Sequence, residues 1–281
     1  MFSEIHWQQT FNEFELQAWQ FYDDLLNHGW SDFTAMAWQQ WALPILGIFA
    51  LSIPYMVLEH FFPRRKIEFR RVFIFDLMHV MAAIALSIPI GRIVYGQVLN
   101  RAQEAHLFDF VPRMPIWLII PITLIGIDFS LYWIHRAMHT NAFWRIHRWH
   151  HSPDHMYWLA GLRASFWHDF LFVCNSLLWT TAMRMPPELY PIGASAAVIS
   201  NNWMHTNLKW NWPRLEKIII TPRTHSVHHA KNPSHHNGNY GAFLSIWDHM
   251  LGTYVNPEPL GDDFELGITD KISVVRLMSG L

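Results

Sequence analysis

Residues 135–151 read HRAMHTNAFWRIHRWHH, so five histidines and three arginines stand at the end of a long hydrophobic run. His135 and His139 are four residues apart, a spacing that on a helix turns both imidazoles to one face about one turn apart. The next histidines follow the pattern HxxHH, at His147, His150 and His151. On a helix, three imidazoles spaced in this way also converge on one side. The stretch therefore predicts a helix end at which one metal ion could contact several imidazoles.

The HxxHH pattern returns near the end of the chain, at His225, His228 and His229. With 19 histidines in 281 residues, roughly 0.1 such strings are expected by chance, so two of them are improbable as coincidence. A ninth histidine, His205, lies four residues after Asn201 at the end of another apolar run. We expect the nine histidines to be metal ligands and Asn201 to hold a metal-bound water.

The donor type limits the metal. Imidazole sites without cysteine suit iron, zinc, copper or nickel rather than magnesium or calcium, and the lone Cys174 lies inside an apolar run. Nine ligands exceed the about four to six positions of one ion, so two ions are predicted. Two irons that bind and split O₂ need many neutral donors, whereas a structural zinc pair does not. Zinc in an isolated protein would remain compatible, because affinity follows the Irving–Williams series.

Asp128, Tyr132, His135 and His139 are spaced 4, 3 and 4 residues apart and form one stripe along a helix. Carboxylates behind metal-binding histidines frequently accept the far N–H of the imidazole and fix its tautomer. We therefore expect Asp128 to serve a ligating histidine in this way.

The composition indicates a membrane protein. Hydrophobic residues make up 51% of the chain and charged residues only 15%, against about 25% charged in soluble domains. The 16 tryptophans suit side chains at the level of the lipid headgroups. A net charge of −2 argues against a nucleic-acid partner, because it could not neutralise a run of phosphates.

Five apolar runs are long enough to cross about 30 Å of hydrocarbon: 39–62, 72–95, 115–135, 166–183 and 187–206. The fold prediction is an all-α membrane bundle of four or five spans with a histidine-rich helical cap that holds two metal ions. Only MRMPPE separates the last two runs, so a re-entrant hairpin is an alternative there. We expect one domain over 1–281, which comprises a surface amphipathic segment (1–34), the bundle with the first histidine boxes (35–206) and a polar part with the last box (207–281).

Basic residues predict the orientation. No Lys or Arg precedes Arg64, whereas five follow the first apolar run within residues 64–71. Cytoplasmic loops carry the excess of Lys and Arg, so this loop is expected to be cytoplasmic. Alternating spans then bring all the histidine positions to the cytoplasmic side, in a protein of the bacterial inner membrane.

Beyond the histidines, the chain resembles the fatty acid hydroxylase/sterol desaturase superfamily, whose membrane members carry HxxxH, HxxHH and a second HxxHH around a di-iron centre. The resemblance rests on DFSLYWIHRAMH (128–139), WRIHRWHHS (144–152), HTNL (205–208), TPRTHSVHHAKNP (221–233) and NYGAFLSIWDHMLGTY (239–254). The final stretches most resemble the alkylglycerol monooxygenase-like bacterial members. Where relatives often have a His-Pro-x-Glu-like segment, this chain has RASFWHD, so His168 and Asp169 are left without a role.

The resemblance implies O₂-dependent chemistry on a lipid chain or sterol, with electrons from an external donor such as a pterin, a ferredoxin or a cytochrome. Hydroxylation of an unactivated C–H is the first interpretation, and desaturation begins with the same hydrogen abstraction. A zinc-binding transport protein would instead place histidines or acids at several depths, and a zinc hydrolase would need a general base. His60, His79 and Asp76, near the first two runs, are expected to be core polar groups, with a position facing the lipid cavity as the alternative for the two histidines.

Overall fold

The computed structural model describes residues 42–68, 72–83, 114–185, 189–261, 264–269 and 273–280. In these ranges the regular elements are helices, joined by three isolated β-bridges and by no strand. The prediction of an all-α fold is thereby confirmed. The expected amphipathic segment 1–34 and the end of the second apolar run lie outside the described residues.

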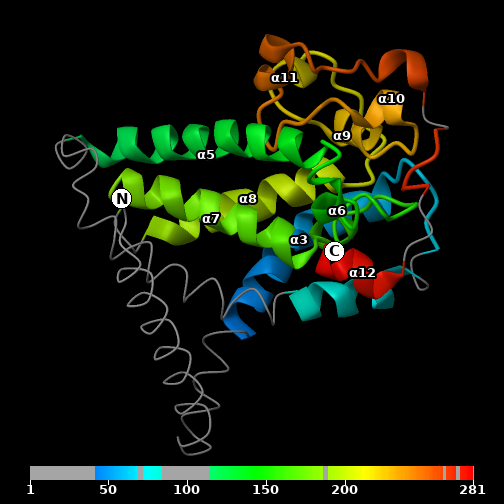
Figure 1. Cartoon of the computed structure of the whole chain (residues 1–281), viewed down its shortest axis with the longest axis horizontal. Coiled ribbons are helices and arrows are strands. Elements are labelled where there is room, and N and C mark those ends of the chain that lie inside the picture. The colour runs from blue at the N-terminus through cyan, green and yellow to red at the C-terminus, as the bar shows by residue number, and fades with distance from the viewer. Residues whose placement is uncertain are drawn as a thin grey trace, which may run out of the picture.

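Long helices form the body of the molecule and lie side by side (Figure 1). They are α3 (Leu43–Phe61), α5 (Ile116–Met138), α7 (Phe166–Ala182) and α8 (Tyr190–His205). A further helix, Val72–Ala83, runs beside them. Each coincides with one of the predicted apolar runs. In the structure α5 packs on α7, and α3 packs on α8.

Close approach of α5 and α7 depends on Gly126. A Cβ at this position would lie 2.4 Å from the Trp179 ring, so glycine lets the indole rest against the helix backbone. Trp179 Nε1 donates to Ser130 Oγ at 2.8 Å, and Asn175 Nδ2 donates to the Ile127 carbonyl at 3.1 Å. Buried polar groups that find such partners avoid a desolvation penalty and fix the register of the two helices.

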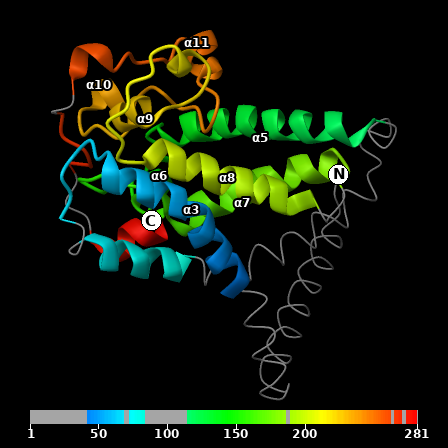
Figure 2. The same cartoon turned by 180° about the vertical axis from the view of Figure 1, so that it is seen from behind.

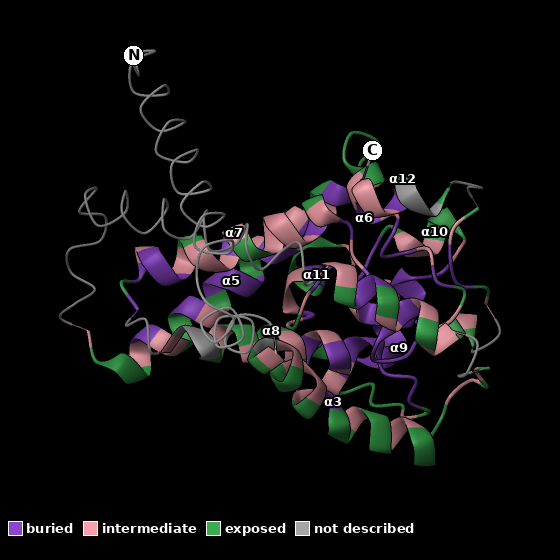
Figure 3. Ribbon diagram, turned by 90° about the horizontal axis from the view of Figure 1, so that it is seen from below, coloured by how far each residue is buried: buried purple, intermediate pink, exposed green. Residues whose placement is uncertain are grey.

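The bundle turns apolar side chains outward. Trp117 on α5 is 68% exposed and Leu178 on α7 is 60% exposed, and exposed positions run along α3 (Figure 3). Of the described helices, α5 is the one long and apolar enough to cross a membrane by length and composition. Helices α7 and α8, of 17 and 16 residues, reach roughly 24 to 26 Å, short of the about 30 Å of hydrocarbon. The number of spans and the hairpin alternative therefore stay predictions.

Short helices gather at one end of the bundle, where α5 and α8 end (Figures 1 and 2). They are α6 (Trp144–His147), α9 (Pro222–His228), α10 (Pro233–His236), α11 (Ile246–Leu251) and α12 (Val274–Ser279). Single 3₁₀ turns lie at η3 (Ala160–Leu162), η5 (Leu215–Lys217) and η6 (Glu258–Leu260). These elements are helices of one or two turns, so their positions depend on tertiary contacts rather than on helix propensity.

Capping residues fix where two of the helices begin. At α9, Thr221 and Thr224 form a reciprocal capping box and Pro222 occupies the first turn, an arrangement that satisfies otherwise unpaired N–H groups. At α7, the Ser165 side chain accepts from the backbone N–H of His168. Both helices begin at the histidine-rich end of the bundle. The N-capping residues therefore help to set the direction of the histidines that follow them.

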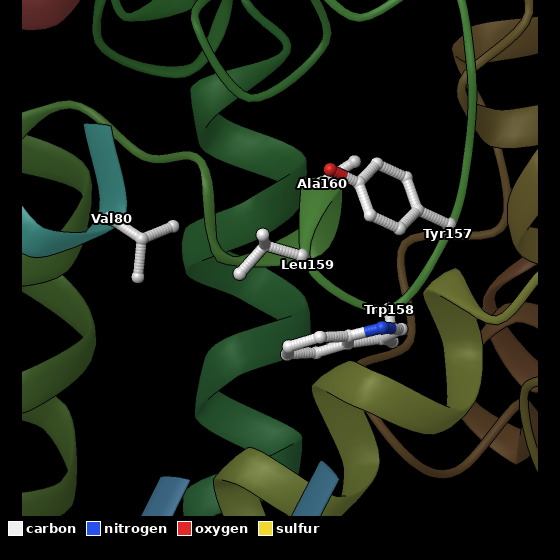
Figure 4. Packing of buried hydrophobic residues seen from close by; sticks show 5 residues of the cluster. All are labelled: Val80, Tyr157, Trp158, Leu159 and Ala160. Atoms are coloured by element: carbon white, nitrogen blue, oxygen red, sulfur yellow. The ribbon is translucent and has the colours of Figure 1, made fainter. Parts of the chain in front are cut away.

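A buried apolar cluster joins the cap to the bundle. Figure 4 shows its members, Val80, Tyr157, Trp158, Leu159 and Ala160, drawn together from a helix and a loop. The Trp158 ring meets Phe49 of α3 edge to face, with 5.8 Å between ring centroids. Glu59 of α3 accepts from the Trp158 backbone N–H at 2.9 Å. The loop that follows the HxxHH stretch of His147–His151 is thus anchored to two helices of the bundle.

Candidate metal centre

The predicted histidines come together in two groups at the junction of the bundle and the cap. In each group, one candidate donor atom per residue lies within 4.8 Å of all the others. The five-histidine group consists of His135, His139, His147, His151 and His228. The four-histidine group consists of His150, His205, His225 and His229. All of them except His139 are buried, so donors from four separate stretches of chain share a water-poor interior.

Each HxxHH box serves both groups. His150 belongs to the four-histidine group while its neighbour His151 belongs to the five-histidine group, and His228 and His229 divide in the same way. Adjacent residues on a helix point about 100° apart, so neighbouring imidazoles diverge. The expectation that each HxxHH box turns all its imidazoles to one side is therefore wrong, whereas His135 and His139 do share one group.

Backbone carbonyls hold four of the imidazoles by their Nδ1 atoms. These contacts join His135 to Tyr240 O (2.8 Å), His150 to Arg163 O (3.0 Å), His205 to Asn201 O (2.8 Å) and His228 to Gly238 O (2.7 Å). A carbonyl oxygen only accepts, so each Nδ1 carries the proton and each Nε2 presents a lone pair. This arrangement is the one that metal-binding histidines adopt when an outer partner fixes the tautomer.

The Nε2 atoms are too close together for lone pairs that face one another without a cation. His150 Nε2 and His205 Nε2, both lone-pair atoms, are 3.1 Å apart. Two nitrogens that each lie about 2.1 Å from a single ion are roughly 3.0 to 3.4 Å apart at the angles of common coordination geometries. In the other group, His147 Nε2 lies 2.9 Å from His135 Nε2 and 3.0 Å from His151 Nε2. The donor set therefore fits a metal ion in each group.

Burial keeps the cap imidazoles neutral. It lowers the pKa of His147, His150 and His151, and likewise of His225, His228 and His229, well below the ordinary value of 6.5. Neighbouring histidines lower these pKa values further, because two imidazolium ions would repel each other. His228 Nε2 is buried and has no hydrogen-bond partner among the described residues. Neutral, desolvated nitrogens of this kind are ready donors for a cation.

The loop that carries Gly238 and Tyr240 is itself held from below. Asp248 of α11 accepts from the backbone N–H of Tyr240 and of Gly241, both at 2.8 Å, and from Thr253 Oγ1 at 2.7 Å. These bonds explain the sequence pattern NYG followed by WD and GT. The Asp248 carboxylate fixes the loop whose carbonyls orient His135 and His228 in the five-histidine group.

Glycine is required at two places near the site. A Cβ on Gly241 would lie 2.5 Å from the Leu244 carbonyl oxygen, and a Cβ on Gly161 would lie 2.4 Å from the His205 ring. Gly161, in η3, thus lets that turn pack directly against an imidazole of the four-histidine group. Sequence reasoning missed it, because a glycine that a side chain merely approaches leaves no local pattern.

The role expected for Asp128 is wrong. Its carboxylate accepts from the backbone N–H groups of Phe243 and Leu244, at 2.8 and 3.2 Å, and from Trp247 Nε1 at 2.7 Å. These donors occupy both of its oxygens, while the Nδ1 of His135 turns to a backbone carbonyl instead. Asp128 therefore ties α5 to the segment around α11 and positions the cap rather than an imidazole.

Asn201 lies one turn before His205 on α8. Its backbone carbonyl accepts from His205 Nδ1, and its side-chain Nδ2 is buried with no partner among the described residues. An unpaired buried amide N–H₂ is costly and is available to a small polar ligand. The expectation that Asn201 holds a water at the centre stays a prediction.

Other polar residues singled out from the sequence lie in different settings. His79 is satisfied in the core, since its Nδ1 lies 2.6 Å from the Phe75 carbonyl, and Asp76 is fully buried. His60 is exposed, so its expected core position is wrong. His168 packs beside both groups, with ring centroids 4.8 Å from His147 and 5.2 Å from His150, but it belongs to neither.

Comparison with known proteins agrees with this site. The fatty acid hydroxylase family model matches residues 120–253, a range that holds all nine histidines. Alkylglycerol monooxygenase of Xenopus tropicalis is 36% identical over 48% of this chain and 30% of its own length. Ornithine lipid hydroxylase OlsE of Rhizobium tropici is 32% identical over 70% of this chain and 58% of its own length.

Delta(7)-sterol 5(6)-desaturase erg3B of Aspergillus fumigatus is 26% identical over 64% of this chain and 51% of its own length. This chain thus spans between about a third and three fifths of these relatives. No solved structure matches it. The family match over residues 120–253 and these relatives show that the histidine-rich region of this chain is similar to the fatty acid hydroxylase/sterol desaturase superfamily.

Proposed function

We propose that this protein is an O₂-dependent di-iron oxygenase of the membrane that hydroxylates an unactivated C–H bond of a lipid. The observation that carries the proposal is the pair of buried histidine groups, whose donors are neutral and converge at distances suited to one ion each. Relatives with up to 36% identity are named as a monooxygenase and a lipid hydroxylase, and their names motivate the choice of reaction and substrate class.

The nine histidines would hold the two irons, which would supply O₂ activation and accept electrons from an external donor. The chain's own residues have three tasks. Carbonyl tethers from Tyr240, Gly238 and Arg163 keep the Nε2 lone pairs pointed inward. The buried shell excludes water, which would otherwise compete with substrate oxidation. An acyl chain would approach along α5 and α8, the helices that carry His135 and His205 near their C-terminal ends.

The two groups are unequal, and we propose that this difference separates their tasks. The four-histidine group offers one donor fewer, which leaves more room for an exchangeable ligand. The buried Asn201 Nδ2, without a protein partner in the described part of the chain, lies one turn from His205 and could donate a hydrogen bond to such a ligand. The five-histidine group would then be the more saturated partner.

Desaturation is the second candidate, favoured by the sterol desaturase among the relatives. Both outcomes begin with removal of a hydrogen atom from carbon. The proposal further assigns the protein to the bacterial inner membrane with the histidine groups on the cytoplasmic side, where a ferredoxin, cytochrome or pterin could deliver electrons. The support is the absence of Lys and Arg before Arg64 and their concentration just after it.

Isotope labelling tests this function. Membranes with the iron-loaded protein, a reductant and lipid extract would consume O₂, and ¹⁸O₂ would place label in a lipid hydroxyl. A new double bond with label only in water would favour desaturation. His228→Ala should abolish both outcomes and lower bound iron, whereas His60→Ala, at an exposed position outside both groups, should leave them intact.

The same assay can reject the proposal. The rejecting result has two parts. The protein would still contain zinc after an attempt to load it with iron, and it would take up no O₂ when reductant and lipid are added. Such a protein would be a non-redox zinc protein.

A further inference from the structure

Arg163 connects a metal-donor histidine to a buried charge. It follows η3 and is 5% exposed. Its backbone carbonyl accepts from His150 Nδ1 at 3.0 Å, so the direction in which His150 presents Nε2 depends on where the Arg163 backbone lies. The position of that backbone is in turn fixed by what holds the Arg163 side chain.

The guanidinium group of Arg163 is fixed on several sides. Its Nη2 donates to Asp76 Oδ1, and its Nη1 donates to Ser152 Oγ at 3.1 Å. The group lies over two rings, 4.9 Å from the Trp149 centroid and 5.3 Å from the Phe75 centroid. Planar guanidinium groups suit this combination of ion pairing and ring stacking, which a lysine could not reproduce.

Asp76 is equally constrained. It is 0% exposed on the helix Val72–Ala83. Its second oxygen, Oδ2, accepts from the Tyr157 hydroxyl at 2.8 Å and lies 3.1 Å from His155 Nε2. A bundle helix outside the histidine boxes thus reaches, through Arg163, to a donor of the four-histidine group.

A buried ion pair of this kind adds little net stability. Its desolvation cost is about as large as its attraction, and apolar replacements are often neutral. What such a pair does well is to fix geometry, because removal of either partner leaves an unpaired buried charge. We infer that Asp76 and Arg163 are a positioning pair for the four-histidine group and act on His150 through the Arg163 carbonyl.

The effect is expected to be selective. Tethers of the five-histidine group come from Tyr240 and Gly238, on a loop that Asp248 holds. Within the four-histidine group, His205 donates to the carbonyl of Asn201 on its own helix. Among the described contacts, His150 is the member that donates to a carbonyl on a separate loop, that of Arg163. Loss of the pair should therefore weaken one metal site and spare the other.

The inference rests on the proposed metal centre but not on the reaction, so the test measures iron. Protein reconstituted with ⁵⁷Fe in detergent is examined by Mössbauer spectroscopy and by iron content. His139→Ala and His205→Ala first assign one quadrupole doublet to each group. Asp76→Asn should then lose the doublet that His205→Ala loses and keep the other. Outer partners of this kind change metal affinity by about 10- to 100-fold.

Two further variants separate positioning from folding. Asp76→Asn combined with Arg163→Gln removes both charges, leaves no unpaired buried ion, and should still lose the same doublet. Tyr157→Phe removes one hydrogen bond to Asp76 but leaves its contact with Arg163, and should keep both doublets. Arg163→Lys should also lose the doublet of the four-histidine group, because lysine lacks the planar group that lies over Trp149.

Two unchanged doublets in the double variant would overturn the inference, and so would equal loss of both, which would mark the pair as general support for the fold. A native protein that binds no iron pair would instead overturn the proposed centre, and the inference with it.

Discussion

At the scale of single residues, the centre depends on which ring nitrogen carries the proton. Sequence spacing predicted the nine histidines but not their tautomers, because the partners are main-chain carbonyls of Tyr240, Arg163, Asn201 and Gly238. Any residue type offers a carbonyl, so no side-chain pattern reveals one. Asp128 was misassigned for the same reason, since its partners are mainly backbone N–H groups that the sequence does not display.

Gly161 gives a prediction at this scale. In Gly161→Ala the new methyl group would clash with the His205 ring, 2.4 Å away in the present geometry, so the ring must shift. We expect lower iron occupancy in the four-histidine group and a protein that still folds. Gly193→Ala, on the same helix as His205 but with nothing within 4 Å of the added Cβ, is the matched control. Equal iron content in the two variants would show that the close approach is unimportant.

At the scale of elements, the sequence predicted the long helices well and the cap poorly. The apolar runs predicted the ends of α3, α5, α7 and α8 to within a few residues. The cap consists of short helices and 3₁₀ turns, which are set by tertiary hydrogen bonds and not by periodicity. The division of each HxxHH box between two groups follows from this, because the direction of each imidazole depends on its local turn.

Asp248 supplies the prediction for the loop of the five-histidine group. In Asp248→Asn one of the two oxygens becomes an N–H₂ group, which cannot accept, so the backbone N–H of either Tyr240 or Gly241 loses its partner. Each unsatisfied buried N–H costs about 1–3 kcal/mol, so the loop should loosen and release His135 and His228. Iron loss from the five-histidine group is expected, measured against Asn256→Ala, an exposed side chain on the following segment. Retention of iron in the five-histidine group would refute this role.

At the scale of the whole molecule, the histidine groups couple stability to pH. In the folded protein, burial lowers the pKa of His147, His150, His151, His225, His228 and His229 well below 6.5. The unfolded chain would protonate these histidines near 6.5 while the folded chain would not, so unfolding takes up protons. The stabilisation is complete above that pH and is lost as the pH falls below it.

Chelator-treated protein should therefore show a melting temperature that falls steadily from pH 7 to about pH 5, with a slope that reflects several protons. Substitution of His150 and His225 by glutamine should flatten the slope. A melting temperature independent of pH over this range would contradict the burial of neutral imidazoles.

The proposed membrane orientation concerns the whole molecule. In a Cys174→Ala background, a cysteine at Ser3 should react with a membrane-impermeant thiol reagent in intact cells. A cysteine at Asn256, on the cap side, should react only after lysis, because the basic loop that starts at Arg64 predicts a cytoplasmic cap. The reverse labelling pattern would invert the proposed orientation.

The central claim is that nine histidines from separate stretches of chain form two adjacent metal sites. Anomalous X-ray scattering at the iron absorption edge, from crystals of the iron-loaded protein, tests it most directly. The account predicts one peak within the group of His135, His139, His147, His151 and His228, and a second within the group of His150, His205, His225 and His229. A single peak, or iron bound away from both groups, would contradict it.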